Sequence, residues 1–577
     1  MNRRAFLSKP APLAKPLTTA LAQPAAPPGP GDPPGDDEII SRFANTSLPT
    51  AARSQAGLNP YTGPWGYTQA AHLLRRCLFG PTRTEITTAA GQTLTQVMNG
   101  LLTAPAAPAA PLNVSATDTS VPQGQTWTTQ PFDQNFEGVR RSSLRAWWLG
   151  QLLDQSPTLV EKMTLFWHNH FVIELGDIND ARYGYHYCAL LRQHALGNIK
   201  QLTEDITVAP AMLRYLNGNQ STATAPNENY GRELLELFTV GKGPLIGPGN
   251  YTTYTEADVQ AAAKVLTGWR DNATTIAGYY TASRHNTTTK QFSAAFQNAT
   301  IGNLGDQEYK ALINLIFAQQ ATAEFLCRKL YRWFVYYVID ATTEAQVIQP
   351  LAQLLITNNY NVAPVLRVLL SSEHFFDTVN MGCVIKSPLD FTVGTCRQLQ
   401  MVFPTASNLV AQYGMWDYLN SVTNVQQQYL GDPPNVAGWA AYWQTPQYYE
   451  MWINAVTLPR RNQLTDLFIS TNGYTRNSVN IKIRPVELVL TLPPATASDP
   501  NLLIAELAKL LLPIPLTANQ LTYLNDTLLP GLPDFEWTVE WQEYLAAPNN
   551  TAKKTAVETK LRALLRAMMG LAEYHLS

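Results

Sequence analysis

Apolar residues recur at i, i+3 and i+4 spacing in segment after segment of this chain, and this periodicity constrains its fold more than any other feature. Such spacing gathers the apolar side chains on one face of an α-helix, and that face must pack against other elements. Alternation typical of a strand is confined to short runs such as 479–483. We therefore predict a mainly α fold: a large multi-helix globular domain with long polar loops and a helical C-terminal subdomain. The predicted helices cover residues 70–77, 141–154, 159–167, 183–196, 228–240, 256–268, 306–317, 321–338, 343–357, 363–376, 391–401 and 551–574.

The composition divides the 577 residues into three regions. Residues 1–36 form a basic, Pro-rich leader and linker, in which residues 22–36 have no large hydrophobic side chain to contribute to a core. Residues 37–478 form the main helical domain, and residues 479–577, where prolines interrupt Leu-rich helices, form the C-terminal subdomain. Long polar loops are predicted at 104–137 and 272–300, and loops of this length in a compact protein are often functional.

Charge and hydrophobicity argue against two classes of protein. The formal net charge is −2 and no run of Lys and Arg is present, so the basic surface expected of a nucleic-acid-binding protein is missing. No uninterrupted apolar stretch approaches the roughly 20 residues that a membrane-spanning helix needs. The five cysteines are scattered without a CxxC pair, which argues against a zinc ribbon and a disulfide framework, although one bridge is allowed in an exported protein.

The N-terminus predicts export. Arg3 and Arg4, followed by Phe6 and Leu7, resemble the start of a twin-arginine signal. Prolines and lysines interrupt the apolar stretch that a signal peptide requires, so a basic disordered tail is the alternative. We expect the periplasm or the cell surface as the location, and the cytoplasm if the signal is degenerate.

Two histidines stand two residues apart in the aromatic segment 166–171, Phe-Trp-His-Asn-His-Phe. On a regular helix His168 and His170 point about 200° apart and cannot chelate one ion, whereas in an extended segment they share a face. The residues after this motif favour a strand, which predicts that the helix ends at Trp167. The two imidazoles are then candidate ligands of a divalent transition metal, and the alternative is a pair of hydrogen-bonded core histidines.

The segment 227–238 predicts a helix with two rows of charged residues. Glu228, Arg232 and Glu236 recur at four-residue spacing, as in a solvated ladder of ion pairs. Glu233 and Glu236 belong to a second row beside the apolar face, an arrangement that resembles the carboxylates of metal sites in helical bundles. In this second interpretation Glu228 is a metal ligand and Glu233 is a general base. Arg232 then holds an anionic substrate, and Glu236 is a further catalytic residue.

Two other segments carry candidate binding residues. His285 lies in the second polar loop and is a further candidate metal ligand, with an exposed and inert histidine as the alternative. Asn435 and Trp439 belong to a turn that contains Pro-Pro-Asn, and Trp443 follows shortly after. These residues are candidates for binding a glycan or a peptide, and the alternative is that the aromatic side chains pack in the interior.

Taken together, these segments resemble the family catalogued as domain of unknown function 1800. The resemblance runs from about residue 65 to about residue 455 and rests on motifs that follow one another in a fixed order. It implies a mostly helical, exported bacterial protein and carries no established activity. It also implies, as a partner, a member of a second exported family related to sulfatases and alkaline phosphatases. The motifs are 71–80, 166–171, 192–198, 210–213, 227–237, 254–259, 266–269, 284–285, 387–388 and 433–439.

The chain departs from the family pattern at two positions. Phe238 stands where many members have the histidine of Glu-Leu-His-Thr-Leu-Gly, and Asn286 stands where the family has an aspartate after the loop histidine. An imidazole and a carboxylate are thus lost. If those groups act as ligands or bases in the family, the resemblance implies a weakened or inactive site here.

Two functions follow from these observations. The first is an exported metal-dependent enzyme, hydrolytic or oxidative, with a His/Glu site whose metal activates water or binds oxygen. The second is a non-catalytic binding or assembly protein of the periplasm or cell surface. The sequence does not decide between an enzyme and a binding protein. The predicted metal ligands are His168, His170, Glu228 and His285.

Overall fold

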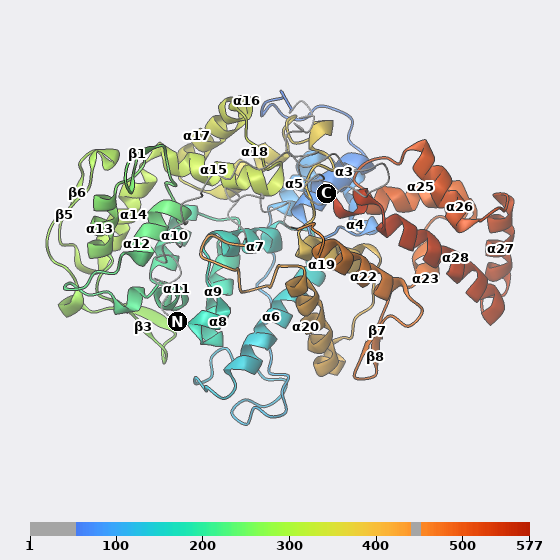
Figure 1. The fold of residues 1–577 in the computed structure, drawn as a ribbon, viewed down its shortest axis with the longest axis horizontal. Helices are drawn as coiled ribbons and strands as arrows, with labels where there is room; N and C mark the ends of the chain where they lie inside the picture. Colours follow the sequence, from blue (N-terminus) through green and yellow to red (C-terminus); the bar gives the residue numbers. More distant parts are fainter. Residues whose placement is uncertain (1–53, 440–451) are drawn as a thin grey trace, which may run out of the picture. The chain divides into compact units, whose positions relative to one another are not determined.

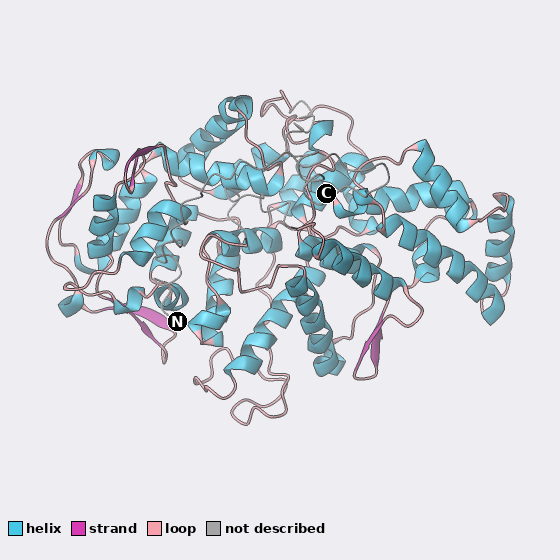
Figure 2. Ribbon diagram, viewed as in Figure 1, coloured by secondary structure: helices cyan, strands magenta, loops and turns pink. Residues whose placement is uncertain are grey.

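The computed structural model describes residues 54–439 and 452–577, all of which belong to one compact unit, residues 54–577. The prediction of a mainly α fold is confirmed (Figures 1 and 2). In the described part, the strands pair only as two-stranded antiparallel hairpins. The predicted leader, residues 1–36, lies outside the described residues.

The helices follow one another with few strands between them. In the first half of the chain they are α3 (Tyr67–Cys77), α4 (Arg83–Ala90), α5 (Leu94–Leu101), α6 (Glu137–Leu153), α7 (Val160–His170), α8 (Leu175–Ile178), α9 (Ala181–Gln193), α10 (Ile199–Thr207), α11 (Pro210–Tyr215), α12 (Glu228–Glu233) and α13 (Glu256–Val265). In the second half they are α14 (Glu308–Phe317), α15 (Gln320–Phe334), α16 (Ala341–Thr343), α17 (Gln349–Thr357), α18 (Val362–Leu370), α19 (Pro388–Gln398), α20 (Leu409–Val425), α22 (Thr457–Ile469), α23 (Pro485–Val489), α24 (Pro494–Ser498), α25 (Pro500–Leu511), α26 (Ala518–Leu528), α27 (Phe535–Ala546) and α28 (Thr551–Met569).

Shorter elements complete the secondary structure. Two π-helical turns continue α12 and α16, namely η2 (Leu234–Phe238) and η6 (Glu344–Ile348). The 3₁₀ turns are η1 (Gly218–Gln220), η3 (Ala282–Arg284), η4 (Ala294–Phe296), η5 (Gly305–Gln307), η7 (Thr378–Asn380), η8 (Ala406–Asn408) and η9 (Ala572–His575). The strands are β1 (Leu245–Gly247), β2 (Asn250–Tyr251), β3 (Trp269–Asn272), β4 (Ala277–Tyr280), β5 (Lys290–Gln291), β6 (Thr300–Ile301), β7 (Tyr474–Arg476) and β8 (Val479–Ile481).

Local sequence signals set several of the helix starts. Thr255 and Asp258 form a capping box at the start of α13, in which each side chain accepts from the other residue's backbone N–H. The Asn227 side chain caps α12 by accepting from the backbone N–H of Asn229. The predicted loop 104–137 has neither helix nor strand before α6, whereas the predicted loop 272–300 contains β4 and β5.

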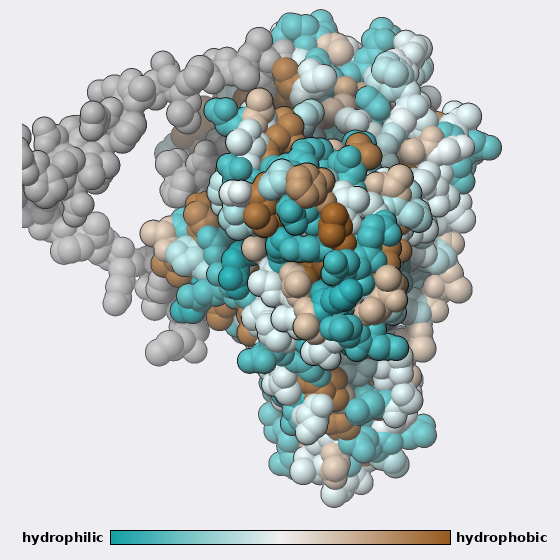
Figure 3. Space-filling model, turned by 90° about the vertical axis from the view of Figure 1, so that its right-hand side faces the viewer, coloured by the Kyte–Doolittle hydropathy of each residue, from teal (hydrophilic) through white to brown (hydrophobic). Residues whose placement is uncertain are grey.

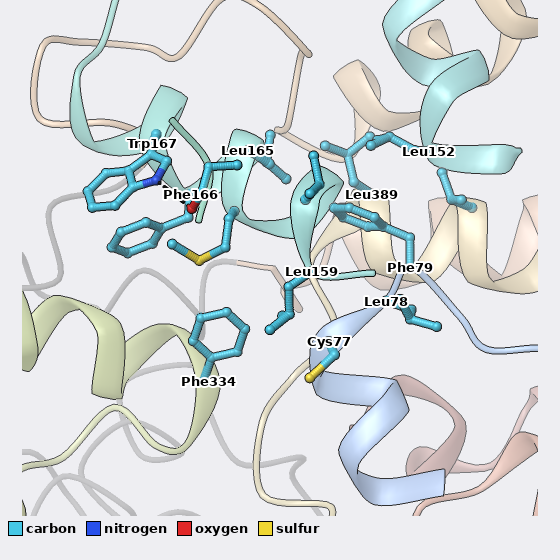
Figure 4. Packing of buried hydrophobic residues seen from close by; sticks show 14 of the residues in the cluster. Cys77, Leu78, Phe79, Leu152, Leu159, Leu165, Phe166, Trp167, Phe334 and Leu389 are labelled. Carbon is cyan, nitrogen blue, oxygen red and sulfur yellow. Dashed lines mark hydrogen bonds between the residues drawn. The ribbon is translucent and has the colours of Figure 1, made fainter. Parts of the chain in front are cut away.

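Helix α7 lies within the core, and its apolar residues meet three other helices (Figure 4). Leu159, just before α7, and Leu165 and Phe166 of α7 belong to one buried cluster with Cys77 of α3, Phe334 of α15 and Leu389 of α19. Burying a side chain of this size stabilises the fold by about 1.5–3 kcal/mol. The packing fixes the ends of α3, α7, α15 and α19 around one region of the molecule.

A pair of glycines brings α3 and α19 into close contact. Gly80 has φ +74°, and a Cβ atom built on it would lie 2.2 Å from the Cα atom of Gly394 in α19. No side chain fits on Gly80 without displacing backbone, whereas a Cβ atom on Gly394 would lie 3.5 Å from the Cα atom of Gly80, an ordinary contact. The end of α3 therefore lies this close to α19 because Gly80 has no side chain.

The C-terminal helices α25 to α28 pack on one another, and they are drawn orange to red in Figure 1. Arg75 of α3 donates hydrogen bonds to the carbonyl oxygens of Lys509 and Leu510, and Gln398 of α19 also donates to Leu510. These bonds join the C-terminal helices to the rest of the unit. The boundary between residues 478 and 479 stays a prediction.

The face formed by the C-terminal helices carries single apolar residues among polar ones (Figure 3). Phe535 is 61% exposed and Tyr523 is 53% exposed on this part of the chain. Scattered apolar residues of this kind are normal on a protein surface. Among the residues that the structure describes, no helix has the length and apolar character required to cross a membrane.

Candidate functional site

Helix α7 continues to His170, so the prediction that it ends at Trp167 is wrong. His168 is fully buried, with its ring centroid 5.1 Å from that of Trp148 and 5.8 Å from that of Trp439. His170 points elsewhere, and its Nε2 lies 3.0 Å from the carbonyl oxygen of Phe238. The helical rotation of about 200° over two residues separates the imidazoles, so they do not form a chelating pair.

The two histidines are neutral core residues. Burial lowers the pKa of His168 to about 3. Burial, followed by the nearby charge of Lys329, holds the pKa of His170 well below its usual range. Lys329 donates to Nδ1 of His170 at 3.0 Å. Within the described part of the chain, neither ring nitrogen of His168 has a hydrogen-bond partner.

His285 is buried in an ion network of its own. Its Nε2 lies 2.9 Å from Glu308, and its Nδ1 lies 2.9 Å from the carbonyl oxygen of Thr267. Glu308 also pairs with Lys290, and the side chains of these two residues are fully buried. The network anchors the polar loop to α14, which contradicts the alternative of an exposed histidine. Its partners do not include the other predicted metal ligands.

The charged rows of α12 behave differently from one another. Arg232 donates to Glu256 at 2.8 Å and to Glu228 at 3.2 Å, and all three side chains are partly exposed. This arrangement is the solvated ladder of ion pairs that the sequence predicted for this helix. The second carboxylate partner of Arg232 is Glu256 of α13 and not Glu236. Glu236 instead accepts from the hydroxyl of Tyr254 at 2.9 Å.

Glu233 has the most perturbed carboxyl of this helix. It is half-buried, and burial, followed by repulsion from Glu236, raises its pKa to about 7. The residue directly precedes η2, and π-helical turns are frequent at functional sites. The general-base role of Glu233 stays a prediction, as do the roles of Arg232 and Glu236.

The predicted metal donors do not converge. Across residues 54–439 and 452–577, no group of three or more His, Cys, Asp and Glu side chains is placed to hold a metal ion. The arrangement of His168, His170, Glu228 and His285 therefore does not fit a shared divalent metal, since protein sites for such ions use several converging ligands.

A pocket lies where the ends of α3, α7 and α15 meet the segment before α19. Its volume is about 60 Å³, which is room for about four or five water-sized groups. Four of its lining residues have cationic side chains and one has a carboxylate side chain, so cationic side chains are in excess. The lining residues are Arg75, Arg76, Lys162, Asn169, Arg332, Trp333, Tyr337, Val384, Ile385, Ser387, Asp390, Gln428, Trp439, Trp452 and Ser577.

Two adjacent arginines of α3 dominate the charge of this pocket. Arg75 is 8% exposed and Arg76 is 3% exposed. In the described part of the chain Arg75 donates only to backbone carbonyls, and Arg76 donates to the carbonyl oxygen of Asn380 at 2.8 Å and to Sγ of Cys383 at 3.4 Å. Within the described residues neither arginine pairs with a carboxylate, and Nε of both and Nη1 of Arg76 have no hydrogen-bond partner. Buried charges are normally paired, so two unpaired guanidiniums side by side call for an anion.

Further cations surround the same region. Lys162 pairs with Asp390, the one carboxylate side chain of the lining, which also accepts from the Ser387 hydroxyl at 2.8 Å. Behind the lining, Lys386 and Arg461 are buried, and burial lowers the pKa of Lys386 to about 7 and that of Arg461 to about 9. The single carboxylate side chain of the lining is thus already paired with Lys162, and the other cationic side chains remain in excess.

Trp439 enters the pocket lining through a turn that is tied to α7. Gly438 has φ +101°, and a Cβ atom built on it would lie 2.7 Å from the carbonyl oxygen of Asn169. Asn169 Oδ1 accepts from the backbone N–H of Trp439 at 2.9 Å. At the start of the same loop, Asp432 accepts from Nε of Arg145 at 2.8 Å. The loop is thus held at both ends, which fixes the indole of Trp439 beside the pocket.

The predicted ligand-binding residues of this loop differ in their positions. Trp439 lines the pocket, as a binding residue would. Asn435 is exposed and shapes the turn by accepting from the backbone N–H of Ala437 at 2.8 Å. Trp443 lies outside the described residues.

Sequence reasoning missed the charged residues of the pocket. Arg75, Arg76, Asn169 and Ser387 lie in motifs that carry the family resemblance, and Trp439 ends another. The positions of these residues within the family motifs were the signal that the sequence offered. The predicted site consisted mainly of histidines and glutamates instead, because their spacing suggests metal binding.

The fold and the pocket define a mainly α-helical protein with a buried, cationic, tryptophan-lined cavity. The chain belongs to the family described as protein of unknown function, DUF1800, which it matches over residues 72–574. The match includes the second half of α3, every residue of the pocket lining except Ser577, and helices α25 to α28, and so extends well beyond residue 455. No curated protein and no solved structure matches the chain.

Proposed function

We propose that this protein binds an acidic ligand without transforming it, and that the acid group of the ligand occupies the pocket beside Arg75 and Arg76. This is the binding-protein alternative drawn from the sequence. The observation that carries it is the pair of buried guanidiniums with unpartnered N–H groups at the wall of a cavity of about 60 Å³.

Energetics supports an anion as the missing partner. A buried cation without a counter-ion destabilises a fold by several kcal/mol, and an oxyanion would offset that penalty on binding. Guanidinium groups also bind carboxylate, phosphate and sulfate through paired N–H donors, which gives the interaction geometric selectivity. A cavity of this volume accommodates the four or five heavy atoms of such a group.

The metal-dependent enzyme receives less support. His168 and His170 face different surroundings, and His285 is engaged by Glu308. We therefore assign no enzymatic step to these residues.

Titration of the full-length protein with sodium sulfate and sodium phosphate tests the proposal. Ionic strength is held constant with sodium chloride. Because a ligand that binds only the folded state stabilises it, we expect saturable binding and a gain of about 2.7 kcal/mol in unfolding free energy at 100 times Kd. Isothermal titration calorimetry and urea unfolding provide the two measurements.

Paired variants separate specific binding from a general salt effect. Arg75→Gln removes a buried pocket charge, whereas Arg460→Gln removes an exposed arginine outside the pocket lining. We expect at least a tenfold weaker sulfate affinity in Arg75→Gln and an unchanged affinity in Arg460→Gln. Equal stabilisation by chloride, or unchanged affinity in Arg75→Gln, would refute the proposal.

We further propose that the protein acts outside the cytoplasm. The support is the Arg3-Arg4 pair and the resemblance of the chain to exported proteins. Replacing both arginines by lysine should leave the precursor in the cytoplasm, as cell fractionation would measure. An unchanged distribution after this double substitution would remove twin-arginine transport from the proposal. A partner from the neighbouring sulfatase-related family stays a prediction.

A further inference from the structure

Four aromatic residues, called the aromatic wall below, line the pocket together with its cations. Trp439 and Trp452 are each 4% exposed, and Trp333 and Tyr337 from the end of α15 are half-buried. The ring of Tyr337 lies against that of Tyr336, with centroids 4.0 Å apart. A ligand whose acid group binds the arginines therefore lies close to these aromatic side chains.

The size of the cavity determines how the ligand is built. About 60 Å³ holds an acid group and no more than part of the ring that carries it. The arginines and the tryptophans line this same small space, so the acid group and the stacking ring must lie within a few bonds of each other. In a mononucleotide a ribose separates the phosphate from the base that would stack, and that distance does not suit this cavity.

Hydrogen-bond donors of the aromatic wall point to a hydroxylated ring. The indole Nε1 atoms of Trp333 and Trp439 are buried and have no partner in the described residues. Asn169 Oδ1 is taken by the backbone of Trp439, which leaves its Nδ2 as a donor. Hydroxyl oxygens of a sugar accept such bonds while its C–H face stacks on indole, whereas a phenyl ring offers no acceptor.

We propose that the ligand of this pocket is an acidic carbohydrate, in which a carboxylate, sulfate ester or phosphate ester on the sugar binds Arg75 and Arg76. This inference rests on the proposed function and adds the chemical class of the ligand. Acidic peptides fit less well, because aliphatic lining is limited to Val384 and Ile385 and no strand edge is available for pairing within the described lining.

Calorimetric titration of the full-length protein with a small panel tests the inference. The acidic sugars are glucuronate, glucose 6-sulfate and glucose 6-phosphate, and the comparison ligands are glucose, inorganic sulfate, phenyl phosphate and adenosine monophosphate. We expect at least one acidic sugar to bind tenfold or more tightly than both glucose and inorganic sulfate. The preferred sugar identifies the acid group.

Substitutions of the aromatic wall give a second readout. Tyr337→Leu and Trp333→Phe should reduce the ratio of acidic-sugar affinity to sulfate affinity at least fivefold. Tyr523→Leu, which removes an aromatic ring that is 53% exposed on α26, should leave this ratio unchanged. Two different substitutions protect the test against one variant that fails to fold.

The outcomes distinguish this inference from the proposed function. If inorganic sulfate binds and no acidic sugar binds more tightly, the anion site stands and the carbohydrate inference is wrong. If phenyl phosphate or adenosine monophosphate binds more tightly than every sugar, the ligand class is wrong. If neither inorganic anions nor acidic sugars bind, both proposals fail.

Discussion

Replacing Arg76 by methionine is expected to abolish oxyanion binding while leaving the unliganded protein at least as stable as the wild type. Arg76 is 3% exposed, and its guanidinium has no carboxylate partner in the described residues. Exchange of a buried charged group for a hydrophobic residue of similar volume is often neutral or stabilising by about 1–4 kcal/mol. Loss of the hydrogen bond to Asn380 offsets roughly 1 kcal/mol of that gain.

Arg140→Met is the matched control, because Arg140 is also fully buried but pairs with Asp118 at 3.2 Å. Its replacement leaves the buried carboxylate of Asp118 uncompensated and is expected to reduce the unfolding free energy by about 3–5 kcal/mol. Urea unfolding and sulfate titration of both variants measure the contrast. A loss of more than about 2 kcal/mol in Arg76→Met with unchanged sulfate affinity would show that Arg76 supports the fold rather than a ligand.

The second large effect is expected at the contact between α3 and α19. A Cβ atom on Gly80 would lie 2.2 Å from backbone of Gly394, and the backbone of Gly80 is in the left-handed region with φ +74°. The atoms nearest to this Cβ position are all main-chain atoms of Gly394, so the end of α3 must move away from α19 to admit an alanine. We expect Gly80→Ala to reduce the unfolding free energy by about 3–5 kcal/mol, and sulfate affinity should fall as α3 shifts.

Gly124→Ala separates backbone strain from the steric contact. Gly124 has φ +85°, but a Cβ atom there would meet nothing within 4 Å. Its replacement by alanine is expected to reduce the unfolding free energy by only about 1 kcal/mol, the effect of the left-handed conformation alone. Urea unfolding of both variants provides the comparison. Equal losses would mean that the contact with Gly394 relaxes freely and does not fix the position of α3.

The sequence predicted the positions of the helices well, because the signals for a helix come from residues close together in the chain. Asn227, Thr255 and Asp258 cap the starts of α12 and α13 through hydrogen bonds that join residues only a few positions apart. The predicted helix 306–317 corresponds to α14, which begins two residues later. Agreement to within a few residues is what periodicity can provide, since helix ends depend on weak preferences.

The uncertainty in the position of helix ends also made the predicted histidine pair wrong. Extension of α7 by three residues, from Trp167 to His170, separates the two imidazoles instead of aligning them. No proline or glycine marks the end of this helix in the sequence. Its last turn is stabilised by distant residues, including Phe238, whose carbonyl oxygen lies 3.0 Å from His170. Helix propensities differ by only a few tenths of a kcal/mol per residue, which is too little to predict where this helix ends.

Taken alone, the sequence determined that the chain is helical and largely where its helices lie, because apolar periodicity and capping act over one or two turns. The tertiary structure alone decided which residues make the pocket. Arg76 is far from Asp390 and Trp439 in the sequence. The three residues line one pocket only when α3, α7 and α19 pack together. Whether an arginine is paired is a property of its surroundings after burial. For this reason two adjacent arginines that were not predicted as site residues define the site in the folded protein.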